Sequence, residues 1–363
     1  FDSERQFGIV SMLQDGQIAF MNQYGRMVSV DDLADFDFKV AGTQGSLQFF
    51  PRKFAVNDYQ IVSLAYHLDD NVVGLGTSIV LGNGSVDIRT NSLAIPAGAG
   101  SRTTVVSTAA TTRSMKVMSL ISDENGIDHQ YDELNIIHDD TEVSITEFGR
   151  LVSNENSTSF TGPGFGTYFA YLDSNQLKVD FIPSVGAALT SNTVRIGFGT
   201  DGISGISTDQ MKHALLEGRS TTIASSGTPG ITTVAEYNFI YDSAYFMVSI
   251  TDTTNDTYEM REIVLMDTDS NEDGTGDLEL TEFGIVETDT PMPYISGLGT
   301  FGSRFNAGGG ISLTFTPEAN IGVDVKVYTQ ALRIEDDSRD DREFGNGFLT
   351  SNYARYEGTE NAV

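Results

Sequence analysis

The sequence predicts an all-β protein of tandem antiparallel β-sandwich domains: two full copies, one N-terminally truncated copy and one short spacer helix. Three observations carry this prediction. Short segments with alternating apolar residues follow one another along the 363 residues, and 37 glycines supply turns between them. Seven or eight such segments per copy, with turn signals at regular spacing, are typical of sandwiches. The third observation is that the same motifs recur in the same order.

The recurring motifs define the copies. Thr146–Gly149 (Thr-Glu-Phe-Gly) recurs as Thr281–Gly284, and Asn22–Ser29 matches Thr146–Ser153. Downstream of each match, a strand with alternating apolar residues ends in proline. These strands carry Leu47, Phe49 and Pro51; Val179, Phe181 and Pro183; and Leu313, Phe315 and Pro317. We infer that one β-rich unit is repeated along the chain.

The repeat boundaries divide the chain into five parts. They are a partial sandwich (1–68), a full sandwich (69–200), a spacer (201–218), a second full sandwich (219–332) and an acidic C-terminal extension (333–363). Because the first copy has only the later strands, we expect the natural polypeptide to extend N-terminally of Phe1. The extension begins with a charged run, which favours a solvated segment over a docking segment for a partner subunit.

A short helix is predicted in the spacer, over Ser207–Glu217. A capping-box pair, Ser207 and Gln210, opens the segment, and Gly218 follows its end. The apolar stripe between them consists of Met211, Ala214 and Leu215.

Composition disfavours several classes of partner. The chain has 51 acidic and 21 basic residues and a net charge of −30, which repels phosphate backbones and anionic lipid. We therefore expect no binding of nucleic acid and no membrane insertion, since no stretch approaches about 20 apolar residues. There is no cysteine, which removes disulfides and thiolate chemistry.

No motif in the sequence indicates an enzyme. The sequence lacks a nucleophile elbow, a zinc-protease helix motif and a phosphate-binding loop. His138 stands beside Asp139 and Asp140 in a hairpin turn, but the equivalent positions in the other copies are Gln14 and Asp267. A catalytic or metal-binding histidine would thus exist in one copy only, so we interpret His138 as a turn residue.

The sharpest local signal is an acidic loop in the last copy. Oxygen-bearing side chains at alternate positions followed by glycine are what a calcium-binding loop needs. The candidate ligands are Asp267, Asp269, Asn271, Asp273 and Asp277. The bidentate acid expected at the last position is missing, because Leu280 stands there. Two interpretations stay open, an exposed acidic hairpin tip and a Ca²⁺ site, and Ca²⁺ is the one cofactor that the sequence suggests.

The order of motifs resembles a known repeat. A His-Asp-Asp-Thr turn (138–141) is followed by Thr-Glu-Phe-Gly (146–149), a Gly-Thr-Tyr strand (166–168), a Phe-Ile-Pro strand (181–183) and a final valine-containing strand. This order is similar to a repeat in virion structural proteins of contractile-tailed phages that infect marine cyanobacteria and related hosts. The resemblance covers everything except the C-terminal extension.

The resemblance implies a virion structural protein of the tail, fibre, baseplate or capsid-decoration type, without enzymatic activity and located on the extracellular particle. It implies contacts with other copies, a homotrimer being favoured, and with other virion proteins. The alternative is an adhesin that binds a carbohydrate or receptor such as a host surface glycan. Its candidate contact residues are the aromatics Phe165, Tyr168, Tyr294 and Phe301.

Overall fold

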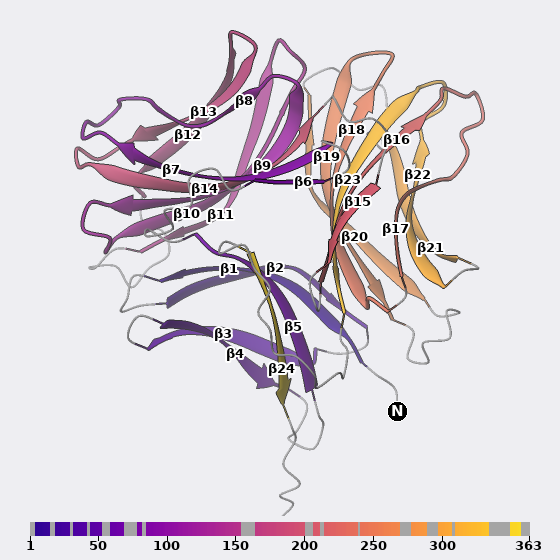
Figure 1. Ribbon diagram of the computed structural model, residues 1–363, viewed down its shortest axis with the longest axis horizontal. Helices are drawn as coiled ribbons and strands as arrows, with labels where there is room; N and C mark the ends of the chain where they lie inside the picture. Colours follow the sequence, from indigo (N-terminus) through magenta and orange to yellow (C-terminus); the bar gives the residue numbers. More distant parts are fainter. Residues whose placement is uncertain are drawn as a thin grey trace, which may run out of the picture.

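In the part of the chain that it describes, the computed structural model is all β, with 24 strands and no helix. That part comprises residues 4–14, 19–29, 32–41, 44–52, 59–68, 78–81, 85–153, 164–199, 206–210, 214–238, 240–268, 277–288, 297–306, 309–333 and 349–356. The strands gather into three lobes around a common centre (Figure 1). The predicted all-β fold of sandwich type is confirmed.

The second lobe is a sandwich of a six-stranded and a three-stranded sheet. Its strands are β6 (Ser78–Leu81), β7 (Val86–Ile95), β8 (Thr103–Ala109), β9 (Thr112–Asp123), β10 (His129–His138), β11 (Val143–Val152), β12 (Gly166–Asp173), β13 (Gln176–Pro183) and β14 (Leu189–Gly199). The large sheet has the order β11-β10-β9-β14-β7-β6, and the small sheet has the order β12-β13-β8. All neighbouring strands are antiparallel.

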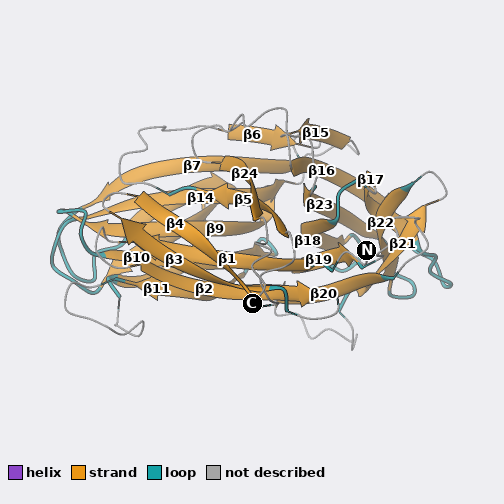
Figure 2. Ribbon diagram, turned by 90° about the horizontal axis from the view of Figure 1, so that it is seen from below, coloured by secondary structure: helices purple, strands orange, loops and turns teal. Residues whose placement is uncertain are grey.

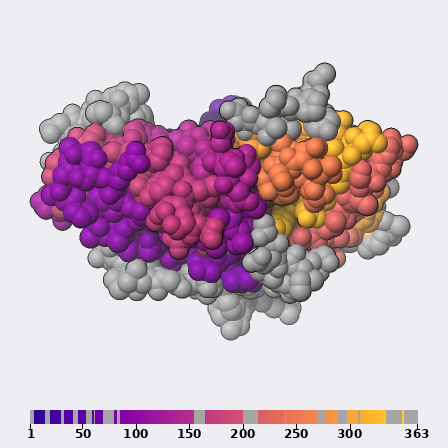
Figure 3. All heavy atoms as spheres, turned by 90° about the horizontal axis from the view of Figure 1, so that it is seen from above, coloured from indigo at the N-terminus to yellow at the C-terminus, as the bar shows by residue number. Residues whose placement is uncertain are grey.

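The third lobe has the same architecture. Its strands are β15 (Ile206–Gln210), β16 (Ala214–Ile223), β17 (Thr232–Asn238), β18 (Ser243–Asp252), β19 (Thr257–Asp267), β20 (Leu278–Glu287), β21 (Gly299–Asn306), β22 (Gly310–Pro317) and β23 (Val323–Leu332). Its sheets, β20-β19-β18-β23-β16-β15 and β21-β22-β17, match those of the second lobe strand for strand. The two lobes lie side by side in the space-filling view (Figure 3).

The first lobe consists of three antiparallel pairs. They are β1 (Gln6–Gln14) with β2 (Ala19–Val28), β3 (Ala34–Ala41) with β4 (Gln44–Pro51), and β5 (Tyr59–Tyr66) with β24 (Leu349–Tyr356). By their motifs and order, β1 to β5 correspond to β10 to β14. Seen from below, β24 lies level with β7 and β16, and β5 lies level with β14 and β23 (Figure 2). The last strand of the chain thus occupies, beside β5, the place that β7 occupies beside β14.

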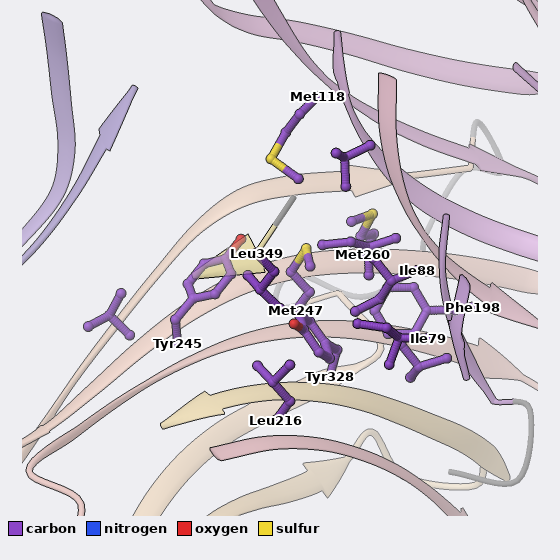
Figure 4. Packing of buried hydrophobic residues seen from close by; sticks show 14 of the residues in the cluster. Ile79, Ile88, Met118, Phe198, Leu216, Tyr245, Met247, Met260, Tyr328 and Leu349 are labelled. Atoms are coloured by element: carbon purple, nitrogen blue, oxygen red, sulfur yellow. The ribbon is translucent and has the colours of Figure 1, made fainter. Parts of the chain in front are cut away.

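Alternation of side chains explains how each large sheet has two apolar faces. In β9, Val117 faces the small sheet of its own lobe, and Met118 faces the centre of the molecule. The second and third lobes each enclose their own sandwich core. A further core, the central core, is formed by side chains from all three lobes, among them Phe7, Phe198 and Tyr328. Figure 4 shows part of it.

The predicted spacer helix over Ser207–Glu217 is wrong. Ile206–Gln210 and Ala214–Ile223 are antiparallel strands, and β16 pairs along its length with β23. Leu215 faces the sandwich core and Leu216 faces the central core, so burial on both faces gives an apolar run that resembles a helical stripe. Residues 201–218 therefore include a hairpin of the third lobe, and Gly218 lies within a strand, opposite Tyr328.

The prediction of a solvated C-terminal extension is wrong for its last strand. Leu349–Tyr356 pairs with β5, and Leu349 is fully buried beside Tyr245 and Met247 (Figure 4). Local sequence patterns could not reveal this strand, because its partner lies near the opposite end of the chain. Residues 334–348, with the acidic run, lie outside the described residues.

We expect Leu349→Ala to lower the free energy of unfolding by about 2–5 kcal/mol, the usual cost of truncating a buried leucine. Leu93→Ala is the matched control, since Leu93 is 36 % exposed. Urea denaturation of both variants measures the difference. Equal, small effects would show that β24 does not contribute to the central core.

Candidate functional site

Three equivalent hairpins meet at the centre of the molecule: β1–β2, β10–β11 and β19–β20. Each contacts the other two. Each also carries a β-bulge at the same place in its register. The extra residue of each bulge is on the second strand of its hairpin, and the bulge includes a glycine with positive φ, namely Gly25 (58°), Gly149 (65°) and Gly284 (60°). Only glycine adopts this conformation readily, which explains why the Phe/Tyr-Gly motif recurs.

The aromatic residues before these glycines meet in the middle. The Tyr24 ring lies edge-on to Phe148, with 6.2 Å between ring centroids, and edge-on to Phe283, with 6.3 Å. Edge-to-face rings at such distances attract each other. The repeated motif therefore brings one ring from each lobe to a single point.

A lysine from the second lobe binds two glutamates next to these rings. Lys116 Nζ lies 2.9 Å from Glu133 Oε2 and 2.8 Å from Glu262 Oε2. It also lies 5.0 Å from the centroid of the Phe148 ring. Lys116 is 4 % exposed, Glu133 2 % and Glu262 0 %. Because Glu133 belongs to the second lobe and Glu262 to the third, the lysine joins two lobes.

Hydrogen-bond donors surround both carboxylates. Glu133 accepts hydrogen bonds from Ser11 Oγ (2.5 Å) and Tyr24 Oη (2.6 Å), both in the first lobe. Glu262 accepts one from Asn135 Nδ2 (2.7 Å), in the second lobe. Ser11 and Asn135 occupy equivalent positions in their hairpins. Tyr131 and Tyr245 donate to Glu133 and Glu262, respectively, within their own lobes. We call Lys116, Glu133, Glu262 and these donors the central cluster.

The pKa values in the central cluster follow from burial and charge. Burial disfavours the ammonium group of Lys116, but attraction by Glu133 and Glu262 outweighs it and raises the pKa of Lys116 well above its usual value. Burial favours the neutral form of Glu133, yet Lys116, Ser11 and Tyr24 lower its pKa. Glu133 therefore contributes stability above its usual pKa, and this contribution is lost as the pH falls through the folded-state pKa.

The central cluster joins lobes through contacts that bury its ions. Each ionised group is bound by groups of the chain itself, and an unpaired charge at these positions would be strongly unfavourable. The arrangement thus favours one relative placement of the three hairpins over alternatives.

A second ionic contact links the first lobe to the third and involves the predicted calcium loop. Arg5 Nη2 lies 3.0 Å from Asp242 Oδ1, and Arg5 Nη1 lies 3.5 Å from Asp267 Oδ2. Asp267 ends β19, and Thr268 N and Oγ1 donate to the main-chain oxygen of Asp277. The structure therefore places Asp267 and Asp277 at the base of one hairpin.

The remaining predicted calcium ligands, Asp269, Asn271 and Asp273, lie outside the described residues. Within the described part of the chain, no group of three or more histidine or acidic side chains is arranged to hold a metal ion. Ca²⁺ binding by this loop stays a prediction.

His138, interpreted from the sequence as a turn residue, is the last residue of β10 and is fully buried. Its Nε2 lies 3.0 Å from the carbonyl oxygen of Thr112, and its Nδ1 accepts a hydrogen bond from the Asp140 amide (3.2 Å). Burial and the nearby Arg113 lower the pKa of His138. The neutral ring therefore fastens the end of the hairpin to β9.

The central cluster is not predicted from the sequence. One signal was present: Glu133 and Glu262 hold equivalent places in strands that are buried at every residue. A charge kept at the same place in two buried strands indicates a buried partner. That partner is Lys116, which is buried like its neighbours Met115 and Val117 on the same strand.

Comparisons with protein-family models, with curated proteins and with solved structures found no match. Among the residues that the structure describes, no helix could span a membrane. The class that the geometry defines is therefore a three-lobed, all-β protein whose lobes are joined by buried ion pairs.

We expect Lys116→Met to lower the free energy of unfolding by about 3–5 kcal/mol, because it leaves two buried carboxylates without their cation. Adding Glu133→Gln and Glu262→Gln should restore most of the loss. Lys178→Met is the matched control, since Lys178 pairs with Asp173 at the surface. Urea denaturation checks this, and a triple variant no more stable than Lys116→Met would contradict the explanation.

We expect the stability of the fold to depend on pH through Glu217 on β16. Burial raises the pKa of its carboxyl group from 4.5 to about 7, and its Oε1 has no hydrogen-bond partner among the described residues. Between these two pH values the folded state holds more protons than the unfolded state, so stability falls as the pH rises. Between pH 4 and pH 8 we expect the free energy of unfolding to decrease by about 3 kcal/mol less in Glu217→Gln than in the wild type. Unfolding curves over this pH range measure the difference. Glu142→Gln, at an exposed residue, is the control. The same pH profile in both variants would show that the pH dependence does not come from Glu217.

Proposed function

We propose that this chain is a structural component of a phage virion, a rigid non-enzymatic body that spaces or joins other proteins of the particle. The observation that carries the proposal is the joining of three β-rich lobes by a buried network of ions and aromatic rings. Such a body resists deformation, because moving one lobe exposes charged groups that have partners only in the assembled arrangement.

Two features of the sequence support the same role. The repeated motifs resemble those of virion structural proteins of cyanobacterial phages. The net charge of −30 disfavours binding to nucleic acid or to anionic membranes, which leaves other proteins as the favoured partners.

Association with copies of itself, as a homotrimer, is also part of the proposal. A single chain already arranges three equivalent hairpins around one centre. A position with threefold symmetry on a particle could thus be matched by a single chain or by a homotrimer. Sedimentation at several protein concentrations distinguishes these cases.

Quantitative mass spectrometry of density-purified phage particles tests the proposal. We expect this chain at a fixed number of copies per particle, retained through high-salt washing. Its recovery only in the particle-free fraction of the lysate would refute a structural role in the virion.

The alternative, an adhesin, is favoured by one aromatic pair that includes an exposed ring. Phe169 is 40 % exposed, stacks on Tyr171 with 5.6 Å between centroids, and has the Arg102 guanidinium 4.3 Å from its own centroid. Exposed rings of this kind can stack on sugar faces. In contrast, Tyr168 packs on Phe181 and Phe301 on Phe315. Phe165 packs against the sandwich core, and Tyr294 lies outside the described residues.

A glycan array with the whole chain separates the two functions. If the chain is an adhesin, a specific glycan binds and Phe169→Ala weakens binding about tenfold or more, roughly 1.4 kcal/mol. Phe50→Ala is the matched control, because Phe50 is also an exposed ring beneath a cation, Lys39. Absence of glycan binding would reject the adhesin, and equal binding by both variants would reject Phe169 as the contact residue.

A further inference from the structure

Each lobe ends its small sheet in a strand that pairs on one side only. These edge strands are β3, β12 and β21, and among the described residues they pair only with β4, β13 and β22, respectively. They are equivalent, because each directly follows the hairpin that carries the Phe/Tyr-Gly motif. An unpaired strand edge is a template for pairing with another chain, and proteins usually protect it with charged side chains, proline or bulges.

Two of these edges are protected. The charged side chains of β3 are Asp35, Asp37 and Lys39. Strand β21 carries Arg304 and, near its middle, Gly302, which offers no side chain for packing between strands. A further strand added to either edge would therefore meet charges or gain little packing.

The edge of β12 lacks this protection. Residues 166–172 include no charged side chain, and the carboxylate of Asp173, the last residue, is bound by Lys178 at 2.6 Å. Strand β12 pairs with β13 without a register shift, so no bulge turns its edge away. On the outer face of the sheet, Phe169 is 40 % exposed and stacks on Tyr171. The edge is thus regular, uncharged and partly apolar.

The main-chain groups of β12 also have an open side. A two-residue turn with positive φ at both residues joins β12 to β13, so Asp173 and Gln176 at its ends form a hydrogen-bonded pair. Hydrogen-bonded and non-bonded pairs alternate along an antiparallel ladder. The N–H and C=O groups of Tyr168, Ala170 and Leu172 therefore point away from β13, and no strand in the described part of the chain pairs with them.

We propose that β12 pairs, edge to edge and antiparallel, with β12 of a second copy of this chain. The strand is its own complement in the register that places Ala170 opposite Ala170 of the second copy. The outward main-chain groups of Tyr168 then meet those of Leu172, and the Phe169 ring lies across from Tyr171. Cross-strand aromatic pairs stabilise a sheet, and this register forms the pair twice. The small sheets of two chains become one continuous sheet.

Charge explains why two copies meet at this strand. The net charge of −30 makes most contacts between copies repulsive. Strand β12 is an exception, since residues 166–172 are uncharged and Asp173 has its own cation. The contact is twofold and so differs from the homotrimer proposed above, because a strand that pairs with itself joins two chains. It does not depend on a role in the virion, since it can be tested on the purified chain.

The experiment measures self-association of the whole chain. A single strand pair is smaller than a standard stable interface, so we expect weak, reversible dimers. In sedimentation velocity, the dimer fraction should rise with protein concentration and with salt, which screens the repulsion between copies. In hydrogen-exchange mass spectrometry, the amides of Tyr168, Ala170 and Leu172 should exchange about tenfold more slowly as the dimer forms, while those of β21 do not change.

A proline in the edge tests the main-chain contact. Ala170→Pro removes an outward N–H group and none of the hydrogen bonds to β13, so it should weaken dimerisation about tenfold or more. Ser303→Pro is the matched control, because Ser303 holds the equivalent place in β21 and should leave the dimer unchanged. Unfolding curves of both variants check that the fold persists.

Charges at one exposed position test the register without disturbing the core. In the proposed dimer, Thr167 lies opposite Asp173 of the second copy. Thr167→Glu should weaken dimerisation about fivefold and Thr167→Lys should strengthen it by a similar factor, because like charges repel and opposite charges attract across strands. The same substitutions at Thr300, the equivalent exposed residue of β21, should have no effect.

Any of the following results would overturn the proposal. The chain could remain monomeric at every concentration and salt, or could associate while the amides of β12 stay unprotected. Ala170→Pro and Ser303→Pro could change association equally. Thr167→Glu and Thr167→Lys could shift it in the same direction, which would show that β12 of one copy does not lie opposite β12 of another.

Discussion

The placement of the three lobes depends on one buried contact, the Lys116 ammonium between Glu133 and Glu262. These ions lie where water cannot solvate them, so each is stable only while the other two are in place. Ser11 of the first lobe donates a hydrogen bond to a glutamate of the second lobe, and Asn135 of the second lobe donates one to a glutamate of the third. Equivalent residues thus form the same kind of bond at both contacts. Hydrophobic packing in the central core supplies affinity between lobes, and the ions select one arrangement among many that apolar surfaces would allow.

The backbone explains why this contact recurs around the centre. Each of the three hairpins has a bulge that contains a glycine with positive φ, and this glycine follows an aromatic residue. The bulge and the glycine together bend the hairpin so that its ring points toward the other two. The motif that marks the repeat in the sequence is therefore the one that joins the lobes. The first lobe departs from the pattern at Ile9, where the other two carry glutamate.

Alternation of apolar residues was sufficient to predict the all-β fold and many of the strands. Alternation did not reveal the strand Ala214–Ile223, because Leu215 and Leu216 are buried on opposite faces of the sheet. Adjacent apolar residues of this kind conceal the two-residue period of a strand. Alternation also missed β24 and the contact of Lys116 with Glu262, since both join segments far apart in the sequence. Glu133 and Glu262 could have been found by aligning the copies. Their partner could not, because the equivalent of Lys116 in the third lobe is Tyr245.

Differential scanning calorimetry of the intact chain tests most directly whether buried ions and rings join the lobes into one body. We predict a single transition whose calorimetric enthalpy equals its van't Hoff enthalpy, because the lobes lose their shared core together. Two or more resolved transitions, each with the enthalpy of one lobe, would show that the lobes unfold independently and would contradict it.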